Sequence, residues 1–391
     1  MDSLPKDPAK DSVSLLKLAL IFLKLGTVAF GGPAAHIAMM EDEFVRKEGL
    51  ISQADFLDRV AAASLIPGPS STEVGIFIGR SLRGWRGLVV AGTCFIVPAA
   101  VLVSLIAAAY VRFGALPQAE GILCAIKPAV IAIILQGLWK LGKAAAKTRM
   151  LILIGAASAF LNFVGVSPLL VLAFAGAASG VLWWLQSGGH QTAALSVTGF
   201  SEALAFRKLI PLAASVAVPL TFARLFFSFL KIGSVVFGSG YVLLAFLQAE
   251  FVDRLHWLTE RQLIDAVAVG QFTPGPVFTT ATFIGYLVGG LPGAAVATIG
   301  IFLPGFIFVA VSGPLIPKIR KSPTAGAILD GVVVGSLALI AVVAWQLGEA
   351  SIRDGFTVSI LLVSIIAIFR FKINSAWLIL GAAVVGWISG I

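Results

Sequence analysis

Two Pro-Gly-Pro runs have the clearest chemical potential, because each interrupts an apolar segment and is followed by hydroxyl side chains. The runs lie at 67–69 and 274–276. Proline suits the first position of a helix and hydroxyls cap free amides, so each run predicts a loop that opens a new helix. A helix start carries partial positive charge and unpaired N–H donors, which together form a natural anion receptor. The residues expected to bind an anion here are Gly68, Ser70, Ser71, Thr72, Gly275, Thr279 and Thr280.

A glycine-rich interruption also divides the first apolar segment of each half. It contains Gly31 and Gly32 in the first half and Gly238 in the second. We expect these glycines to allow close backbone approach, or a second unwound stretch beside the anion site. Glycine alone is weak support, because it is common in membrane helices for packing.

Lys24 and Lys231 are embedded in apolar sequence. A lysine at mid-bilayer costs about 2.5–3.5 kcal/mol, so it usually faces a cavity or a partner; the alternative is snorkelling to the interface. We expect both lysines to supply positive potential at the anion site. Replacing either lysine by alanine should then abolish the function of the protein.

Four side chains are candidates for binding a coupling proton. Glu73 follows the first helix start, opposite Thr280 in the other half, where a carboxylate can compete with an anion or release it on protonation. His36 can titrate near neutral pH. Glu43 and Asp58 are also candidates, although they and their counterparts in the second half are expected in amphipathic helices at the interface, where charge is ordinary.

The composition predicts a membrane protein. Apolar residues make up 59% of the 391 residues and charged residues only 12%. A soluble protein has about 25% charged residues, and apolar runs long enough to cross a hydrocarbon core of about 30 Å recur along this chain. The net charge of +9 comes from short basic clusters between these runs. Such clusters are typical of loops that orient a protein in the bilayer, so nucleic acid is not an expected partner.

Other chemistry is not indicated. Cys94 and Cys124 lie in apolar segments and the three histidines are widely spread, so neither a disulfide framework nor a metal site is expected. No nucleotide-binding glycine loop and no nucleophile–base constellation is present. We therefore expect no cofactor, no catalytic residue and no enzymatic activity. The apolar stretch after residues 1–12 lacks a small-residue cleavage signature, so no removable signal peptide is expected.

The chain contains two copies of one unit. Phe-Leu-Lys-Leu-Gly at 22–26 returns as Phe-Leu-Lys-Ile-Gly at 229–233, and Trp139 returns as Trp345. The predicted organisation is a first repeat at 1–186, a linker at 187–218 and a second repeat at 219–391, with 209–223 as an optional extra segment. Each repeat has six apolar segments: 13–40, 58–80, 87–111, 120–140, 149–164 and 167–186 in the first, and 219–247, 264–288, 293–315, 327–347, 355–370 and 373–391 in the second.

The basic clusters predict that the two repeats are inverted. They follow the second and fourth segments of the first half, but the third and fifth segments of the second half. This shift by one loop is expected if the halves lie upside down relative to each other. Six crossings per half would instead make them parallel, so one segment must enter and leave on the same side. The Pro-Gly-Pro segment is the re-entrant candidate, because proline and glycine break helices. The predicted fold is therefore an all-α polytopic membrane protein.

The sequence resembles the chromate ion transporter family in its two-unit, long-chain form. The resemblance covers nearly the whole chain and rests on Phe-x-Lys-x-Gly-x-x-x-Phe-Gly-Gly-Pro at 22–33 and the motifs at 67–72, 79–85, 237–241, 257–259 and 270–276. It implies chromate efflux from the bacterial cytoplasm as the usual activity, and hence a multi-pass protein of the inner membrane. Sulfate is the look-alike ion.

We therefore expect a secondary transporter that exports chromate, driven by membrane potential, a proton gradient or both. An inside-negative potential favours dianion export by about 4.6 kcal/mol per 100 mV, twice the value for one charge. The alternatives are a carrier of sulfate or another oxyanion and, in another class, a membrane-embedded enzyme or lipid-handling protein. A homodimer remains an open arrangement.

Overall fold

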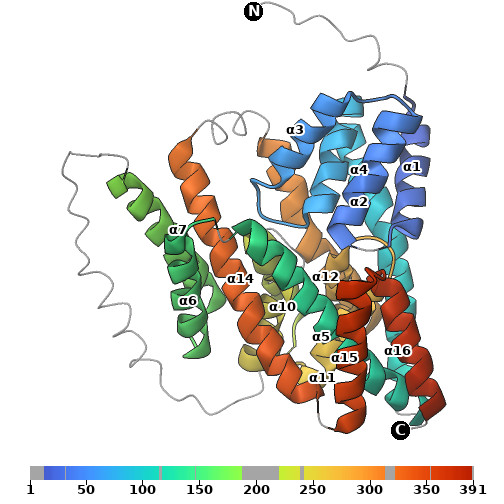
Figure 1. Ribbon diagram of the computed structural model, residues 1–391. Helices are drawn as coiled ribbons and strands as arrows, with labels where there is room; N and C mark the ends of the chain where they lie inside the picture. The colour runs from blue at the N-terminus through green and yellow to red at the C-terminus, as the bar shows by residue number, and fades with distance from the viewer. Residues whose placement is uncertain are drawn as a thin grey trace, which may run out of the picture.

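The chain is helical throughout the part that the structure describes. The computed structural model describes residues 13–30, 32–113, 117–145, 147–186, 220–237, 242–312, 322–352 and 354–389, and these contain no strand. This confirms the predicted all-α fold (Figure 1). The expected linker at 187–218 and two candidate glycines, Gly31 and Gly238, lie outside these residues.

The helices of the first repeat cover its predicted apolar segments. Its first segment is split into α1 and α2, and its second is split by the Pro-Gly-Pro run into α3 and the start of α4. The elements are α1 (Leu15–Val28), α2 (Gly32–Glu41), the π-helix η2 (Asp42–Lys47), α3 (Gln53–Ala63), α4 (Ser70–Phe113), α5 (Pro117–Ala145), α6 (Arg149–Phe163) and α7 (Pro168–Gln186).

The second repeat has the same order of elements, including the π-helix. Its 3-10 turn η5 stands between the second Pro-Gly-Pro run and the following helix. The elements are α9 (Phe222–Val235), α10 (Val242–Leu247), η4 (Gln248–Arg254), α11 (Glu260–Phe272), η5 (Val277–Thr279), α12 (Thr280–Ser312), α14 (Pro323–Ser351), α15 (Gly355–Arg370) and α16 (Ser375–Ser389).

Equivalent hydroxyls begin equivalent helices in the two repeats. Ser14 caps α1 by accepting a backbone amide, and Thr221 caps α9 in the same way. Ser52 caps α3, and Thr259 caps α11 with a full capping box. Each cap satisfies an amide that the helix leaves unpaired. The duplication therefore extends to the local signals that start the helices.

A sharp chain reversal divides both α4 and α12. The backbone leaves the helical region at Arg83 and Gly84 in α4, with a φ of +58° at Gly84. Beyond it the chain folds back so closely that a β-carbon on Gly79 or Gly87 would collide with the backbone of the other. Gly290 reverses α12 in the same way, with a φ of +62°. We call residues 70–82 and 280–288 the first and second half-helix.

The two repeats exchange helix contacts reciprocally. From the first repeat, α5 packs against α15 and α16 of the second, and α14 of the second packs against α6 and α7 of the first (Figure 1). Since α5 corresponds to α14, and α6 and α7 to α15 and α16, the same surfaces serve both partners. This is the pattern of a two-fold arrangement. The helices α4 and α12, which carry the two half-helices, also contact each other.

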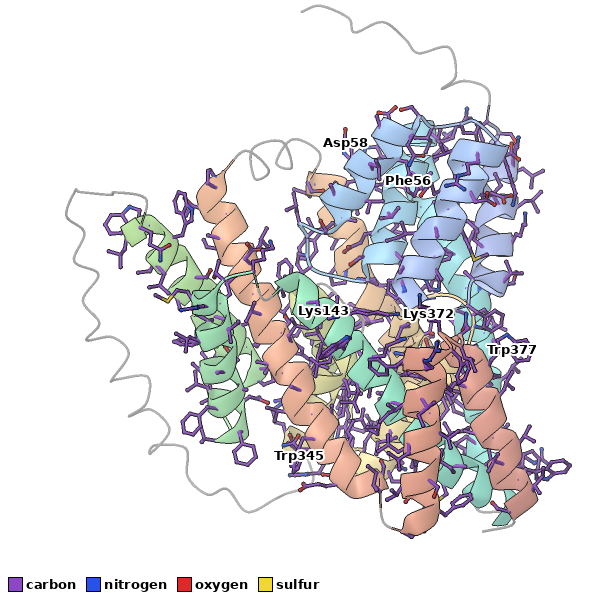
Figure 2. All side chains as sticks on the ribbon, in the orientation of Figure 1. Phe56, Asp58, Lys143, Trp345, Lys372 and Trp377 are labelled. Atoms are coloured by element: carbon purple, nitrogen blue, oxygen red, sulfur yellow. The ribbon has the colours of Figure 1, made fainter. Side chains whose placement is uncertain are left out.

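The outer surface is strongly apolar. Among the described residues, five helices are long and apolar enough to cross a membrane. Trp345 and Trp377 are 65% and 70% exposed and lie on the outside (Figure 2). Exposed apolar surface on this scale is unfavourable in water and is expected of a surface that faces lipid.

Candidate functional site

The two Pro-Gly-Pro runs meet the opposite repeats through a matched pair of backbone hydrogen bonds. We call 67–69 the first tip and 274–276 the second tip. The Gly68 amide donates to the carbonyl of Val236 at 2.7 Å, and the Gly275 amide donates to the carbonyl of Ala29 at 2.9 Å. Ala29 ends α1 and Val236 ends α9. Each tip therefore contacts the end of the first helix of the other repeat.

Both tips need glycine at their centres. Gly68 has a φ of +138° and Gly275 a φ of +88°, where other residues are strained. A β-carbon on Gly275 would also lie 2.7 Å from that of Ala99 in α4. The sequence-predicted breaks are therefore real backbone features that allow the two repeats to approach closely.

The first tip is the turn of a helical hairpin. The Arg59 guanidinium on α3 donates through Nε to the Ser81 hydroxyl on the first half-helix at 3.1 Å. Arg59 precedes the first tip and Ser81 follows it, each by at least two helical turns along the chain. The two arms therefore run back along each other, so the hairpin begins and ends on the same side of its tip.

The two threonine hydroxyls after the second tip bond within their own turns. Thr279 and Thr280 donate at 2.8 Å to the carbonyls of Pro276 and Val277, respectively. Thr72 is buried and its hydroxyl has no hydrogen-bond partner among the described residues. Ser70 begins the first half-helix, and at the other break Gly32 begins α2 with a φ of +79°.

Glu73 distinguishes the first tip from the second. Its side chain is fully buried, and neither carboxylate oxygen has a hydrogen-bond partner among the described residues. A β-carbon on Gly68 would collide with this carboxylate, and one on Gly305 of α12 would lie 3.6 Å from its Oε1. The carboxylate thus fills the space between the first tip and the second repeat. The second repeat has Thr280 at the equivalent position.

His36 joins the two tips through a chain of hydrogen bonds. Its Nδ1 lies 3.1 Å from the Ser71 hydroxyl, and its Nε2 lies 3.1 Å from the carbonyl of Ala29. Because a carbonyl only accepts, Nε2 carries the proton and Nδ1 accepts from the hydroxyl. The same carbonyl accepts the Gly275 amide of the second tip. The counterpart of His36 is Leu243, so the second repeat lacks this chain.

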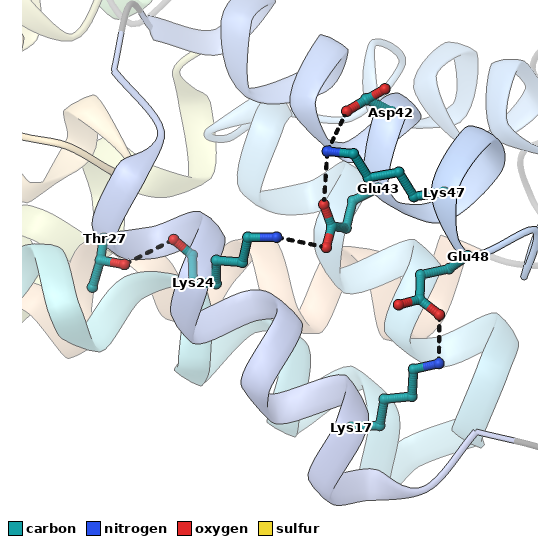
Figure 3. A network of polar contacts seen from close by, with 7 residues as sticks. All are labelled: Lys17, Lys24, Thr27, Asp42, Glu43, Lys47 and Glu48. Carbon is teal, nitrogen blue, oxygen red and sulfur yellow. Dashed lines mark hydrogen bonds and ion pairs between the residues drawn. The ribbon is translucent and has the colours of Figure 1, made fainter.

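The two embedded lysines are each paired with a carboxylate on a π-helix. Lys24 donates to Glu43 at 2.9 Å (Figure 3), and Lys231 donates to Glu250 at 2.5 Å. Glu250 also accepts from Arg254. The lysine side chains are 57% and 42% exposed, while the glutamates are buried. Both repeats therefore hold an ion pair, rather than a lone cation, along their first helices.

The pair in the first repeat belongs to a larger charged network (Figure 3). Lys47 contacts both Glu43 and Asp42, the latter at 2.7 Å, and Lys17 binds Glu48 nearby. The hydrogen bond from Lys47 lowers the pKa of the Asp42 carboxyl. This network is solvent-accessible in part, as expected where a membrane helix meets the interface.

Asp58 and its counterpart have opposite environments. Asp58 is exposed on α3 (Figure 2). Asp265, at the same position of α11, is fully buried and is held by Tyr110 and Lys127 from the first repeat. The sequence-based expectation of an interfacial position thus fits Asp58 but not Asp265. Lys127 was missed altogether, although a lysine within an apolar segment is the same signal that singled out Lys24.

Comparison with known proteins identifies relatives along nearly the entire chain. A sequence model of the chromate transporter family matches residues 16–181 and 223–387. The chain is 33% identical to the chromate transport protein of Cupriavidus metallidurans, covering 96% of this chain and 93% of the relative. It is 31% identical to a probable chromate transport protein of Synechococcus elongatus, covering 95% of each. It is 30% identical to the chromate transport protein of Pseudomonas aeruginosa, covering 94% and 90%. No solved structure matches.

Proposed function

This chain belongs to the chromate transporter family, whose members are membrane transporters, and from that premise we propose that it exports chromate from the cytoplasm. The observation that carries the proposal is the reciprocal contact of the two tips, each of which opens a half-helix at the junction of the repeats. Half-helix starts offer N–H donors and partial positive charge to an oxyanion. Paired breaks of this kind are the usual pointer to a transport site. The bacterial inner membrane is the proposed location.

Membrane potential is the proposed driving force, with a contribution from protons. An inside-negative potential favours export of a dianion by about 4.6 kcal/mol per 100 mV. Uptake against the same potential would need several coupled cations. The proposed proton-responsive group is Glu73, because a buried carboxylate without a partner is costly when ionised.

The proposed topology is that of inverted repeats with re-entrant hairpins at both tips. The hairpin bond between Arg59 and Ser81 supports this for the first tip, and the shift of the basic clusters supports the inversion. Cysteine accessibility labelling should place the loops around Arg83 and Arg320 on the same, cytoplasmic face. Labelling from opposite faces would rule out the inversion.

Lys24 and Lys231 are proposed to add positive potential along the first helices. We expect Lys24→Ala or Lys231→Ala to abolish export at normal membrane abundance, because each removes positive potential from a first helix and one of the cations that neutralise a buried glutamate. Export and abundance should be measured in the same cells. Unchanged export by either variant would remove that lysine from the mechanism.

Anion flux in proteoliposomes of defined orientation tests the function itself. Labelled chromate should leave the compartment that corresponds to the cytoplasm, faster as that compartment becomes more negative. Unlabelled sulfate should compete at higher concentrations than chromate. Sulfate flux without chromate flux would make the protein a sulfate carrier. Chemical turnover without any anion flux would instead indicate a membrane-embedded enzyme or lipid-handling protein.

A further inference from the structure

A buried charged cluster joins the repeats beside the second half-helix. The Tyr110 hydroxyl of α4 donates to Oδ2 of Asp265 at 2.9 Å, and the Lys127 ammonium of α5 lies 3.4 Å from Oδ1. Asp265 is fully buried and Lys127 nearly so. Tyr110 holds one oxygen firmly, whereas the lysine is beyond ordinary hydrogen-bond distance of the other. The ion pair is thus close enough for charge compensation but not tightly bonded.

The cluster contacts the second half-helix through Tyr110. The Tyr110 ring packs edge-on against Phe283 with 5.3 Å between ring centroids, and Phe283 is three residues after Thr280. On α5, Lys127 shares a helix face with Ile134, since residues seven apart lie on one side. Ile134 lines a small cavity with Thr280 and other residues around the second tip. Lys127 is therefore a buried cation on the same face of α5 as Ile134, about two helical turns from it.

The shared architecture does not require this ion pair. By the spacing that relates Trp139 to Trp345, Lys127 corresponds to Val333 on α14, a helix of the same 29-residue length as α5. Asp265 corresponds to Asp58, which is exposed. Since apolar residues commonly replace a buried pair without loss of stability, packing alone does not explain its presence. An ionisable residue at membrane depth indicates function.

We propose that Lys127 is an oxyanion-binding residue and that Asp265 is its counter-ion in the empty protein. This deepens, and rests on, the proposed export function. When chromate passes along the second half-helix, Lys127 exchanges the carboxylate for the oxyanion, and Tyr110 holds Asp265 in place meanwhile. Lys24 and Lys231 are less suited to this exchange, because each lies within hydrogen-bond distance of its glutamate. The proposed ligand class is a tetrahedral dianion, with chromate as the probe.

The test removes both charges together, so that no buried charge is left alone. K127Q/D265N is compared with the control K147Q/D330N, which neutralises another lysine–aspartate pair between the repeats. In this control pair the Lys147 Nζ lies 2.7 Å from Oδ1 of Asp330, and both side chains are partly exposed. Chromate flux and the chromate-dependent rise in unfolding temperature are measured on both. K127Q/D265N should lose the rise and at least roughly 30-fold in flux, while the surface variant keeps both. K127M/D265L is a second version, because apolar pairs of similar size are usually tolerated.

Two results would overturn the assignment. Wild-type flux in either buried-pair variant would make the pair structural, and a retained temperature rise with lost flux would place binding elsewhere. If the wild-type protein itself carries no chromate, the proposed function fails as well. The wild-type flux thus separates failure of the function from failure of this site.

Discussion

The two tips have matching backbones but different chemistry. Each donates a glycine amide to the end of the opposite first helix. The first has the buried Glu73 carboxylate against its glycine, whereas Thr280 at the second tip is bonded to its own turn. A carboxylate beside a half-helix start repels an oxyanion and takes up the same positive potential. We therefore propose that the second tip receives the anion and the first responds to protons.

The neighbouring side chains extend this difference. Lys127 adds a buried cation to the cluster beside the second half-helix, and the equivalent Val333 adds none. His36 links Ser71 of the first half-helix to the Ala29 carbonyl, while its counterpart is apolar. The two repeats therefore share their backbone arrangement and differ in a few side chains around the tips and half-helices.

The largest effect on chromate flux is expected from placing a carboxylate at the second tip, as the first tip has. Thr280→Glu should reduce chromate flux by roughly 100-fold, since burying a charge costs about 2.5–3.5 kcal/mol and the new carboxylate repels the oxyanion. Thr280→Gln has the same size without the charge and should keep substantially more flux. Equal flux in the two variants, at equal membrane abundance, would show that charge at this tip is unimportant.

Removing the carboxylate of the first tip should have a more selective effect. Glu73→Gln keeps the shape and loses the ionisable group. Flux driven by membrane potential alone should stay within about threefold of wild type, because the anion-binding tip is intact, while acceleration by an imposed pH gradient should disappear. The two gradients are applied separately to proteoliposomes. Acceleration by the pH gradient equal to wild type would assign proton coupling to another group.

The smallest effect is expected from removing the link between the tips. His36→Leu introduces the residue of the second repeat, and the Ala29 carbonyl keeps its bond to Gly275. Only the Ser71 hydroxyl loses its acceptor, so the free energy of unfolding should fall by about 1 kcal/mol. Thermal unfolding in detergent measures this. A loss of chromate flux with unchanged stability would instead make His36 part of the transport mechanism.

Local signals explain why much of the fold was predictable. Apolar runs, Pro-Gly-Pro runs and glycines act on the few residues around them, and the helices accordingly lie in the predicted segments. The contacts of the site join residues far apart in the chain. Tyr110 and Asp265 are separated by 155 positions, and no local pattern indicates that they meet. For the same reason Asp58 and Asp265 look alike in sequence but differ in burial, because different helices pack over them.

The hydroxyls after the tips illustrate the same limit at short range. Their positions follow from the sequence, but their acceptors depend on the exact turn. Thr279 and Thr280 bond to carbonyls of their own turn, which a pattern of residue types cannot distinguish from amide capping. The orphaned hydroxyl of Thr72 likewise follows from tertiary packing.

The most direct test is to locate the bound anion by anomalous scattering from chromium in crystals of the protein grown with chromate. The different roles of the two tips predict one peak, beside the second half-helix, between its start at Thr280 and the Lys127 ammonium. A peak beside Glu73 at the first tip, or equal peaks at both tips, would contradict them.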